Sequence, residues 1–230
     1  MRGRTPLLVL ALSCGLAAQI PMDALTPQHR AEVQDILKRL DFQFQIRTQP
    51  QQVRLTTVEK LYDRPRLAAA MWRSCAFVPT LYAEERPDRS FWVSDGRGLT
   101  GTMTLIHQAP GFRVYVADGY VARGRMGNPI GVGARMITVY RYWEGSKGFE
   151  THLQTWTALD SALLGFLSRP FRAYIQRRQE EFIGYIFHNI AQGGKFATLD
   201  PESFRDPLRR EGDPVAIRQF EDAFGRNGRR

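Results

Sequence analysis

The chain has 230 residues, with 32 basic and 23 acidic side chains and a net charge of +9. This length fits one domain that can bury a core of its own. The basic residues form no run of five, and no element carries a basic stripe with interleaved aromatic residues. Nucleic-acid binding is therefore not expected, whereas peripheral contact with an anionic membrane stays open.

The first 18 residues have the pattern of a secretory signal peptide. Arg2 and Arg4 precede an uninterrupted apolar run at 7–12, and small residues follow up to Ala18. The run is too short to span a bilayer of ~30 Å as a helix. We expect export to the periplasm or the exterior with cleavage near Ala18. Lipid attachment at Cys14 and a buried N-terminal helix are the alternatives.

Cleavage would change both the charge and the cysteine content. It removes two basic and no acidic residues, which leaves 30 against 23 and a net charge of +7. Cys75 would be the only cysteine left, so no intrachain disulfide is expected. No later apolar run approaches membrane length. The mature protein is therefore expected to be soluble or peripheral.

The first elements after the leader are a helix, two extended segments and a second helix. Thr26-Pro27 is a typical helix start, and apolar residues recur at helical spacing up to Leu40. The alternation in 42–46 predicts a strand. The β-branched segment 53–62 also predicts an extended conformation, which ends before Pro65. Residues 65–74 then predict a short helix.

The middle of the chain predicts a meander of strands. Candidate strands lie at 91–93, 99–107, 112–121, 136–143 and 149–157. Short turns join most of them, so they should be antiparallel neighbours. The glycine-rich connection at 124–133 is either a flexible loop or a gate. Period-two alternation places Met103, Met136 and Tyr140 on the face toward the long helix, and Arg135, Arg141 and the threonines 100, 102 and 104 on the opposite face.

The long helix is expected at 163–190, kinked or restarted at Pro170. Its apolar stripe buries Phe182, so Phe182→Ala should cost about 3–5 kcal/mol. Gly193-Gly194 should end it. The expected organisation is a signal peptide at 1–18, an N-terminal helix and extended segment at 19–50, the main domain at 51–194, and a polar tail with one short helix at 195–230.

Catalytic and metal-binding motifs are absent from the sequence. There is no H-E-x-x-H, G-x-S-x-G, phosphate-binding GKS/GKT or C-x-x-C motif. The four histidines lie on different expected elements, so neither a metal nor a cofactor is expected. Instead, aromatic residues and methionines are frequent on the expected strands and the long helix. They indicate either a ligand cavity or an ordinary aromatic-rich core.

Three polar residues stand among the apolar positions of these elements. Arg178 lies in the apolar stripe of the helix, where it is either a polar anchor or a snorkelling side chain. Arg178 or His152 would be the anchor for a ligand carboxylate or hydroxyl. His152, with Glu150 or Asp118, would be the acid–base pair of an enzyme. If they do not take part in catalysis, His152 and Asp118 are expected to be ordinary surface residues.

The order of elements, a strand, a helix, several antiparallel strands and a long helix, resembles the helix-grip superfamily. That group includes START lipid-transfer domains, pollen-allergen-like proteins and polyketide cyclases (SRPBCC proteins). Three sequence features carry the resemblance: Thr57 to Pro65, similar to the family's first strand; Leu67 to Trp72 with Pro79; and the helix from Leu163 to Asn189. Asp63-Arg64 and Pro170 depart from the family pattern.

The resemblance implies an α+β fold in which a curved antiparallel sheet wraps around the C-terminal helix, with a tunnel between them. The expected function is an exported carrier of a lipid, sterol or polyketide-like molecule. An enzyme of the cyclase or hydrolase kind that uses the same cavity, and an interaction module with a solid core, are the alternatives. The expected ligand-binding residues are Trp92, Met103, Tyr120, Met136, Tyr140, Trp156, Phe171, Tyr174, Arg178 and Phe182.

Overall fold

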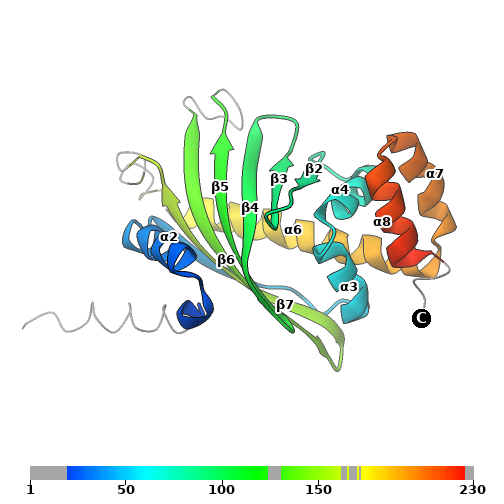
Figure 1. The fold of residues 1–230 in the computed structure, drawn as a ribbon, viewed down its shortest axis with the longest axis horizontal. Coiled ribbons are helices and arrows are strands. Elements are labelled where there is room, and N and C mark those ends of the chain that lie inside the picture. Colours follow the sequence, from blue (N-terminus) through cyan, green and yellow to red (C-terminus); the bar gives the residue numbers. More distant parts are fainter. Residues whose placement is uncertain (1–19, 124–130, 162–164, 166–169, 171, 226–230) are drawn as a thin grey trace, which may run out of the picture.

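The computed structural model describes residues 20–123, 131–161, 165, 170 and 172–225. The protein is α+β, as expected. Seven antiparallel strands form one curved, unclosed sheet in the order β1-β7-β6-β5-β4-β3-β2. One helix covers part of the front of the sheet in Figure 1, and a long helix runs behind it.

The elements follow in chain order. The strands are β1 Phe42–Arg47, β2 Tyr82–Glu85, β3 Ser90–Ser94, β4 Leu99–Ala109, β5 Phe112–Val121, β6 Val132–Gly145 and β7 Gly148–Leu159. The helices are η1 Met22–Ala24, α2 Pro27–Lys38, α3 Leu55–Tyr62, α4 Pro65–Ser74, α6 Arg172–Leu199, α7 Glu202–Glu211 and α8 Pro214–Phe224. The strand order agrees with a helix-grip arrangement, since the first strand pairs with the last.

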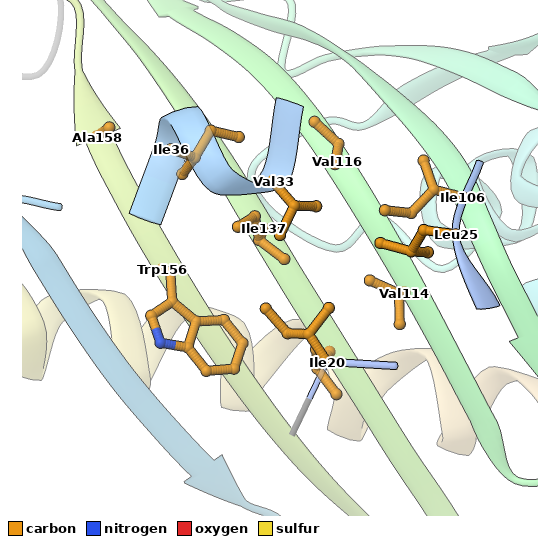
Figure 2. Close-up of a cluster of buried hydrophobic side chains, with 11 residues drawn as sticks. Ile20, Leu25, Val33, Ile36, Ile106, Val114, Val116, Ile137, Trp156 and Ala158 are labelled. Atoms are coloured by element: carbon orange, nitrogen blue, oxygen red, sulfur yellow. The ribbon is translucent and has the colours of Figure 1, made fainter. Parts of the chain in front are cut away.

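The face of the sheet that packs on α2 will be called the α2 face. Thr26 caps α2 by accepting a hydrogen bond from the His29 backbone N–H, as the Thr-Pro start predicted. Figure 2 shows Val33 and Ile36 of this helix lying over Ile137. Trp156 is fully buried in the same cluster. The cluster is aliphatic apart from this indole, so it forms a dry core.

The opposite side, the α6 face, packs on the long helix. Tyr140 and Tyr142 of β6 contact Ile183 and Phe187 of α6 in one cluster. The Tyr140 and Phe187 rings lie 4.7 Å apart. Arg141, between the two tyrosines, instead donates to Gln154 on the α2 face. The predicted alternation of β6 is therefore confirmed.

One expected strand is a helix. Residues 55–62 form α3, although their β-branched residues predicted an extended segment. Val58 and Leu61 are buried at helical spacing, so tertiary packing outweighs the local propensity. The strand that opens the fold is β1, which pairs with β7. The sheet therefore begins at Phe42, within the segment 19–50 that was expected to precede the main domain.

The long helix does not end at Gly193-Gly194, as the sequence suggested, but continues to Leu199. A side chain at Gly194 would approach Leu61 and Thr57 of α3 to 3.1 Å. Glycine at this position permits close packing of α6 on α3 and does not stop the helix. Most of the expected first part of the helix, between residues 162 and 171, lies outside the described residues.

The C-terminal segment is more ordered than a polar tail. It forms two helices, α7 and α8, where the sequence suggested one. Phe204, Leu208 and Phe220 are buried in a cluster with Leu67 and Met71 of α4. The segment therefore completes a second core at the end of α6 (Figure 1).

The expected signal peptide at 1–18 lies outside the described residues, as does most of the glycine-rich connection at 124–130. Ile20, the first described residue, is buried in the α2-face cluster. No described helix is long and apolar enough to cross a membrane.

Candidate functional site

The strand register aligns five side chains in a row across the α6 face, which we call the apolar row. Phe91 lies opposite Met103, which lies opposite Ala117. Ala117 is paired with Met136, and Met136 with Thr157. Five strands at about 4.8 Å spacing make this row roughly 19 Å long. Its members Phe91, Met103 and Met136 are only partly buried, so this part of the face is not closed like the α2 face.

The next row along the strands has almost no side-chain volume. Gly101 is paired with Gly119, and Gly119 with Ala134. A Cβ added to Gly119 would meet nothing nearer than two carbonyl oxygens at 3.9 Å. The sheet therefore presents a shallow surface beside two methionines, which adapt readily to the shape of a bound molecule.

A buried arginine lies on the same face, four residues along β5 from Ala117 of the apolar row, which is about 13 Å. The side chain of Arg113 is only 2% exposed. Its Nε donates to the Tyr142 hydroxyl at 3.1 Å, and its Nη2 donates to Asp63 Oδ1 at 2.6 Å. Phe91 contacts Tyr115, two residues along β5 from Arg113, edge to face. Tyr115 therefore connects the arginine to the apolar row.

Tyrosine rings surround this arginine. The Arg113 guanidinium lies over the rings of Tyr62 and Tyr142, and Tyr62 stacks edge-on against Tyr140 and Tyr142. Burial raises the pKa of Tyr62 and Tyr140 above the ordinary tyrosine value. All these hydroxyls are therefore neutral at physiological pH.

The charge state of the arginine is fixed by its partners. Burial opposes the charge, but hydrogen bonds with Tyr142, Tyr115 and Asp63 hold the pKa of Arg113 above its ordinary value. Half of the Asp63 side chain remains exposed to solvent. The cluster thus provides a permanent cation whose carboxylate partner is half exposed. An acidic or hydroxyl group that took the place of Asp63 would gain the same charge-assisted hydrogen bond.

Two hydroxyls lie toward the opposite end of the row. Thr155 and Thr157 are buried, and their Oγ atoms have no hydrogen-bond partner among the described residues. Buried polar groups are rarely left unsatisfied in proteins. The hydroxyls of Thr155 and Thr157 are therefore available to hydrogen-bond a ligand on the β7 side of the α6 face.

The ten residues expected to bind a ligand divide into groups. Met103, Met136 and Tyr140 lie on the α6 face, as expected. Trp92, Tyr120 and Trp156 point to the other side of the sheet, because their paired residues continue the α2 face. Phe171 lies outside the described residues. The remaining three, Tyr174, Arg178 and Phe182, are exposed on α6.

Arg178 is not an anchor inside a cavity. Its side chain is 66% exposed, bonds Glu181 at 3.1 Å and lies over the Tyr174 ring. The snorkelling alternative therefore describes Arg178 better. Phe182 is 36% exposed, which contradicts the large stability loss expected for its truncation. The stripe was misassigned because α6 buries the face around Ile183 and Phe187.

The expected acid–base pairs are not placed on the α6 face. His152 is paired with Arg141, and Asp118 with Arg135. The two positions are six residues apart along β6, about 20 Å. Glu150 bonds Arg47 at 3.0 Å. Burial and then the nearby Arg141 and Arg47 lower the pKa of His152, so it is a neutral residue of the α2 face.

Sequence reasoning did not select Arg113, Asp63, Tyr62, Tyr115 or Phe91 as site residues. The alternation of β5 contained the signal for two of them, since Arg113, Tyr115 and Ala117 share one face. Tyr62 and Asp63 could not be found in this way, because their segment was expected to be a strand. They reach the site from the C-terminal end of α3.

A separate hollow lies away from the sheet. It measures about 310 Å³ and lies between the ends of α4, α6 and α7. Its lining includes Cys75, Phe196, Leu199 and Phe204. Burial raises the pKa of the Cys75 thiol, so this cysteine is not activated as a nucleophile. Within the described ranges, no three His, Cys, Asp or Glu residues are grouped to hold a metal ion.

No protein-family model and no curated protein matches the sequence. Among solved structures, an uncharacterized protein from Rhizobium leguminosarum aligns with 66% of this chain and 93% of its own, at 15% identity and a TM-score of 0.45. A protein from Chromobacterium violaceum aligns with 66% of this chain and 96% of its own, at 12% identity and a TM-score of 0.41. A conserved protein from Geobacillus kaustophilus aligns with 67% of this chain and 93% of its own, at 8% identity and a TM-score of 0.42.

Proposed function

We propose that the protein is an exported carrier of an apolar small molecule that bears an acidic or hydroxyl group. The ligand lies on the apolar row between the sheet and α6, and its polar group interacts with Arg113. The observation that carries this proposal is the buried, charged Arg113 on the same face of the sheet as the partly buried Phe91, Met103 and Met136, with Tyr115 between them. Ligand sites combine such apolar surface with a few polar groups.

The resemblance to START and SRPBCC proteins supports the same location. Proteins of that group hold lipids, sterols or polyketides between the sheet and the long helix, and the sheet order and α6 fit this arrangement. The proposal moves the polar anchor from Arg178 to Arg113. Binding without turnover is favoured over catalysis, because His152 and Asp118 lie on the α2 face.

Export is part of the proposal. Cleavage after Ala18 would make Ile20 the second residue of the mature chain, so the buried contact of Ile20 with the sheet would be kept. Intact mass of protein recovered from the exported fraction should show the loss of residues 1–18. Full-length protein in the cytoplasm would contradict it.

The test is a binding measurement with a fluorescent fatty acid and with sterols and aromatic polyketides as competitors. Arg113→Met should weaken binding of the fatty acid about tenfold or more, which is about 1.4 kcal/mol. Arg47→Met is the matched control, because Arg47 is exposed and on the α2 face. Failure of the wild-type protein to bind any member of the panel would refute the carrier. Turnover of a bound ligand would favour the enzyme.

A further inference from the structure

The exposed apolar side chains of this protein gather on one helix. Five of the eight large hydrophobic residues that are exposed in the described part of the chain belong to α6: Tyr174, Phe182, Tyr185, Phe196 and Leu199. Tyr174, Phe196 and Leu199 are 61%, 54% and 71% exposed. Scattered single exposures are normal, whereas gathered ones mark interaction surfaces.

These five residues share one side of the helix, the outward stripe. At 3.6 residues per turn they fall within an arc of about 100°. Ile183 and Phe187, which pack on the sheet, lie on the opposite side. From Tyr174 to Leu199 the stripe is about 38 Å long at 1.5 Å per residue. The helix therefore buries one side in the protein and carries these five residues on the other. On that side Tyr185 also packs edge-on against Trp72 of α4, and Phe196 and Leu199 border the ends of α4 and α7.

Basic side chains accompany the stripe at its first turns. Arg177 and Arg178 are 80% and 66% exposed, and Glu181 bonds both. The guanidinium of Arg178 lies over the ring of Tyr174. Tyrosine and arginine both place apolar atoms in lipid and a polar end in the headgroup layer.

The positive net charge of the protein favours an anionic lipid surface over a second copy of the chain as the partner of this stripe. Without residues 1–18 the exported protein would carry +7, so a second copy would bring like charge against like charge, whereas an anionic lipid surface attracts it. The hollow of about 310 Å³ at the far end of the stripe is lined by Phe196 and Leu199. It offers an apolar recess that an acyl chain can enter.

We infer that the outward stripe of α6 docks the protein on an anionic lipid surface, with α6 lying in the plane of the interface. Helices with aromatic and aliphatic residues on one side and basic residues beside them bind membranes in this way. The stripe belongs to the same helix that covers the proposed ligand site. A carrier docked through it would hold that site close to the lipid.

The experiment is co-sedimentation of the full chain with vesicles. Wild-type protein should bind vesicles of phosphatidylglycerol and phosphatidylethanolamine, bind pure phosphatidylcholine more weakly, and dissociate as salt rises. The triple substitution Tyr174→Gln, Phe196→Gln and Leu199→Gln should weaken binding at least tenfold. The control is Tyr120→Gln, since Tyr120 is exposed but lies on the α2 side of β5.

Three further results decide the interpretation. Equal vesicle binding by the wild type and the triple variant would overturn the inference. A wild-type dimer in light scattering that the triple variant converts to a monomer would also overturn it, since the stripe would then contact a second copy. Fatty-acid binding without vesicles should be the same in both proteins, so a failure of docking is distinguishable from a failure of the carrier.

Discussion

The two faces of the sheet solve the same packing problem in different ways. On the α2 face, Val33, Ile36, Ile137 and Trp156 form an aliphatic core around one indole. The α6 face instead holds a buried arginine among tyrosines, and beside it a row of partly buried methionine and aromatic side chains. A face needed only for stability does not require the second arrangement, since a buried ion pair contributes little net stability. Both faces contribute buried clusters to stability, and the proposed function is assigned to the α6 face alone.

The largest effect expected from this comparison is at Trp156. Trp156→Ala should lower the free energy of unfolding by about 3–5 kcal/mol, because it removes a large, fully buried side chain. Urea unfolding followed by circular dichroism measures this loss. Ligand binding should survive in the fraction that remains folded. A loss below about 1 kcal/mol would show that the cluster around Trp156 contributes little to the free energy of unfolding.

Alkaline pH should lower the stability of the protein through the buried tyrosines of the α6 face. Burial raises the pKa of Tyr62, Tyr140, Tyr115 and Tyr142. Above the unfolded value of about 10 the unfolded chain loses these protons while the folded protein keeps them, so stability is complete below pH 10 and falls as pH rises. The loss is about 1.4 kcal/mol per pH unit for each of Tyr62 and Tyr140, whose pKa values are raised most.

Urea midpoints between pH 8 and pH 11 test this dependence. The double substitution Tyr62→Phe and Tyr140→Phe should make the decline above pH 10 shallower. An unchanged decline in the double variant would mean that other groups cause it.

Two glycines of α6 should respond to alanine in opposite ways, because one packs against α3 and the other faces open space. Gly194→Ala should destabilise by about 1–3 kcal/mol, because the new methyl group would press on Leu61 and Thr57. Gly184→Ala should stabilise by up to about 1 kcal/mol, since nothing lies within 4 Å and alanine favours the helix. Equal signs for the two changes in thermal unfolding would contradict the placement of α6 on α3.

The smallest effect is expected at Phe182. Its side chain is 36% exposed, so Phe182→Ala should cost less than about 1 kcal/mol. The matched core variant is Phe187→Ala, whose ring packs on Tyr140, and it should cost clearly more. Similar urea midpoints for the two variants would show that the sheet-facing side of α6 is misassigned.

The alternation of the sequence predicted six of the seven strands and missed the short edge strand β2. Strand register follows from period-two patterns, and a slip of one residue would have placed Arg141 against α6. Helical segments were harder. The β-branched residues of segment 55–62 predicted an extended conformation, and Gly194 predicted the C-terminal end of the long helix. Both predictions failed because contacts from distant residues, between α3 and α6, decide these conformations.

The candidate site was predictable only in part. Met103, Met136 and Tyr140 follow from the alternation, but Arg178 and Phe182 were placed in the interior from one helical stripe. The helix has two apolar sides, and no local pattern shows which one meets the sheet. The Arg113–Asp63 pair joins β5 to the end of α3, 50 residues apart, and such pairs cannot be derived from periodicity.

Fatty-acid affinity of the wild type, Arg113→Met and Arg47→Met, measured together in solution without vesicles, tests the central claim most directly. The account predicts that the wild type and Arg47→Met bind alike, and that Arg113→Met binds about tenfold more weakly while remaining folded. Its fold should persist because the half-exposed Asp63 can be solvated once its partner is gone. Equal affinity of all three proteins would contradict the assignment of the α6 face as the ligand site anchored by Arg113.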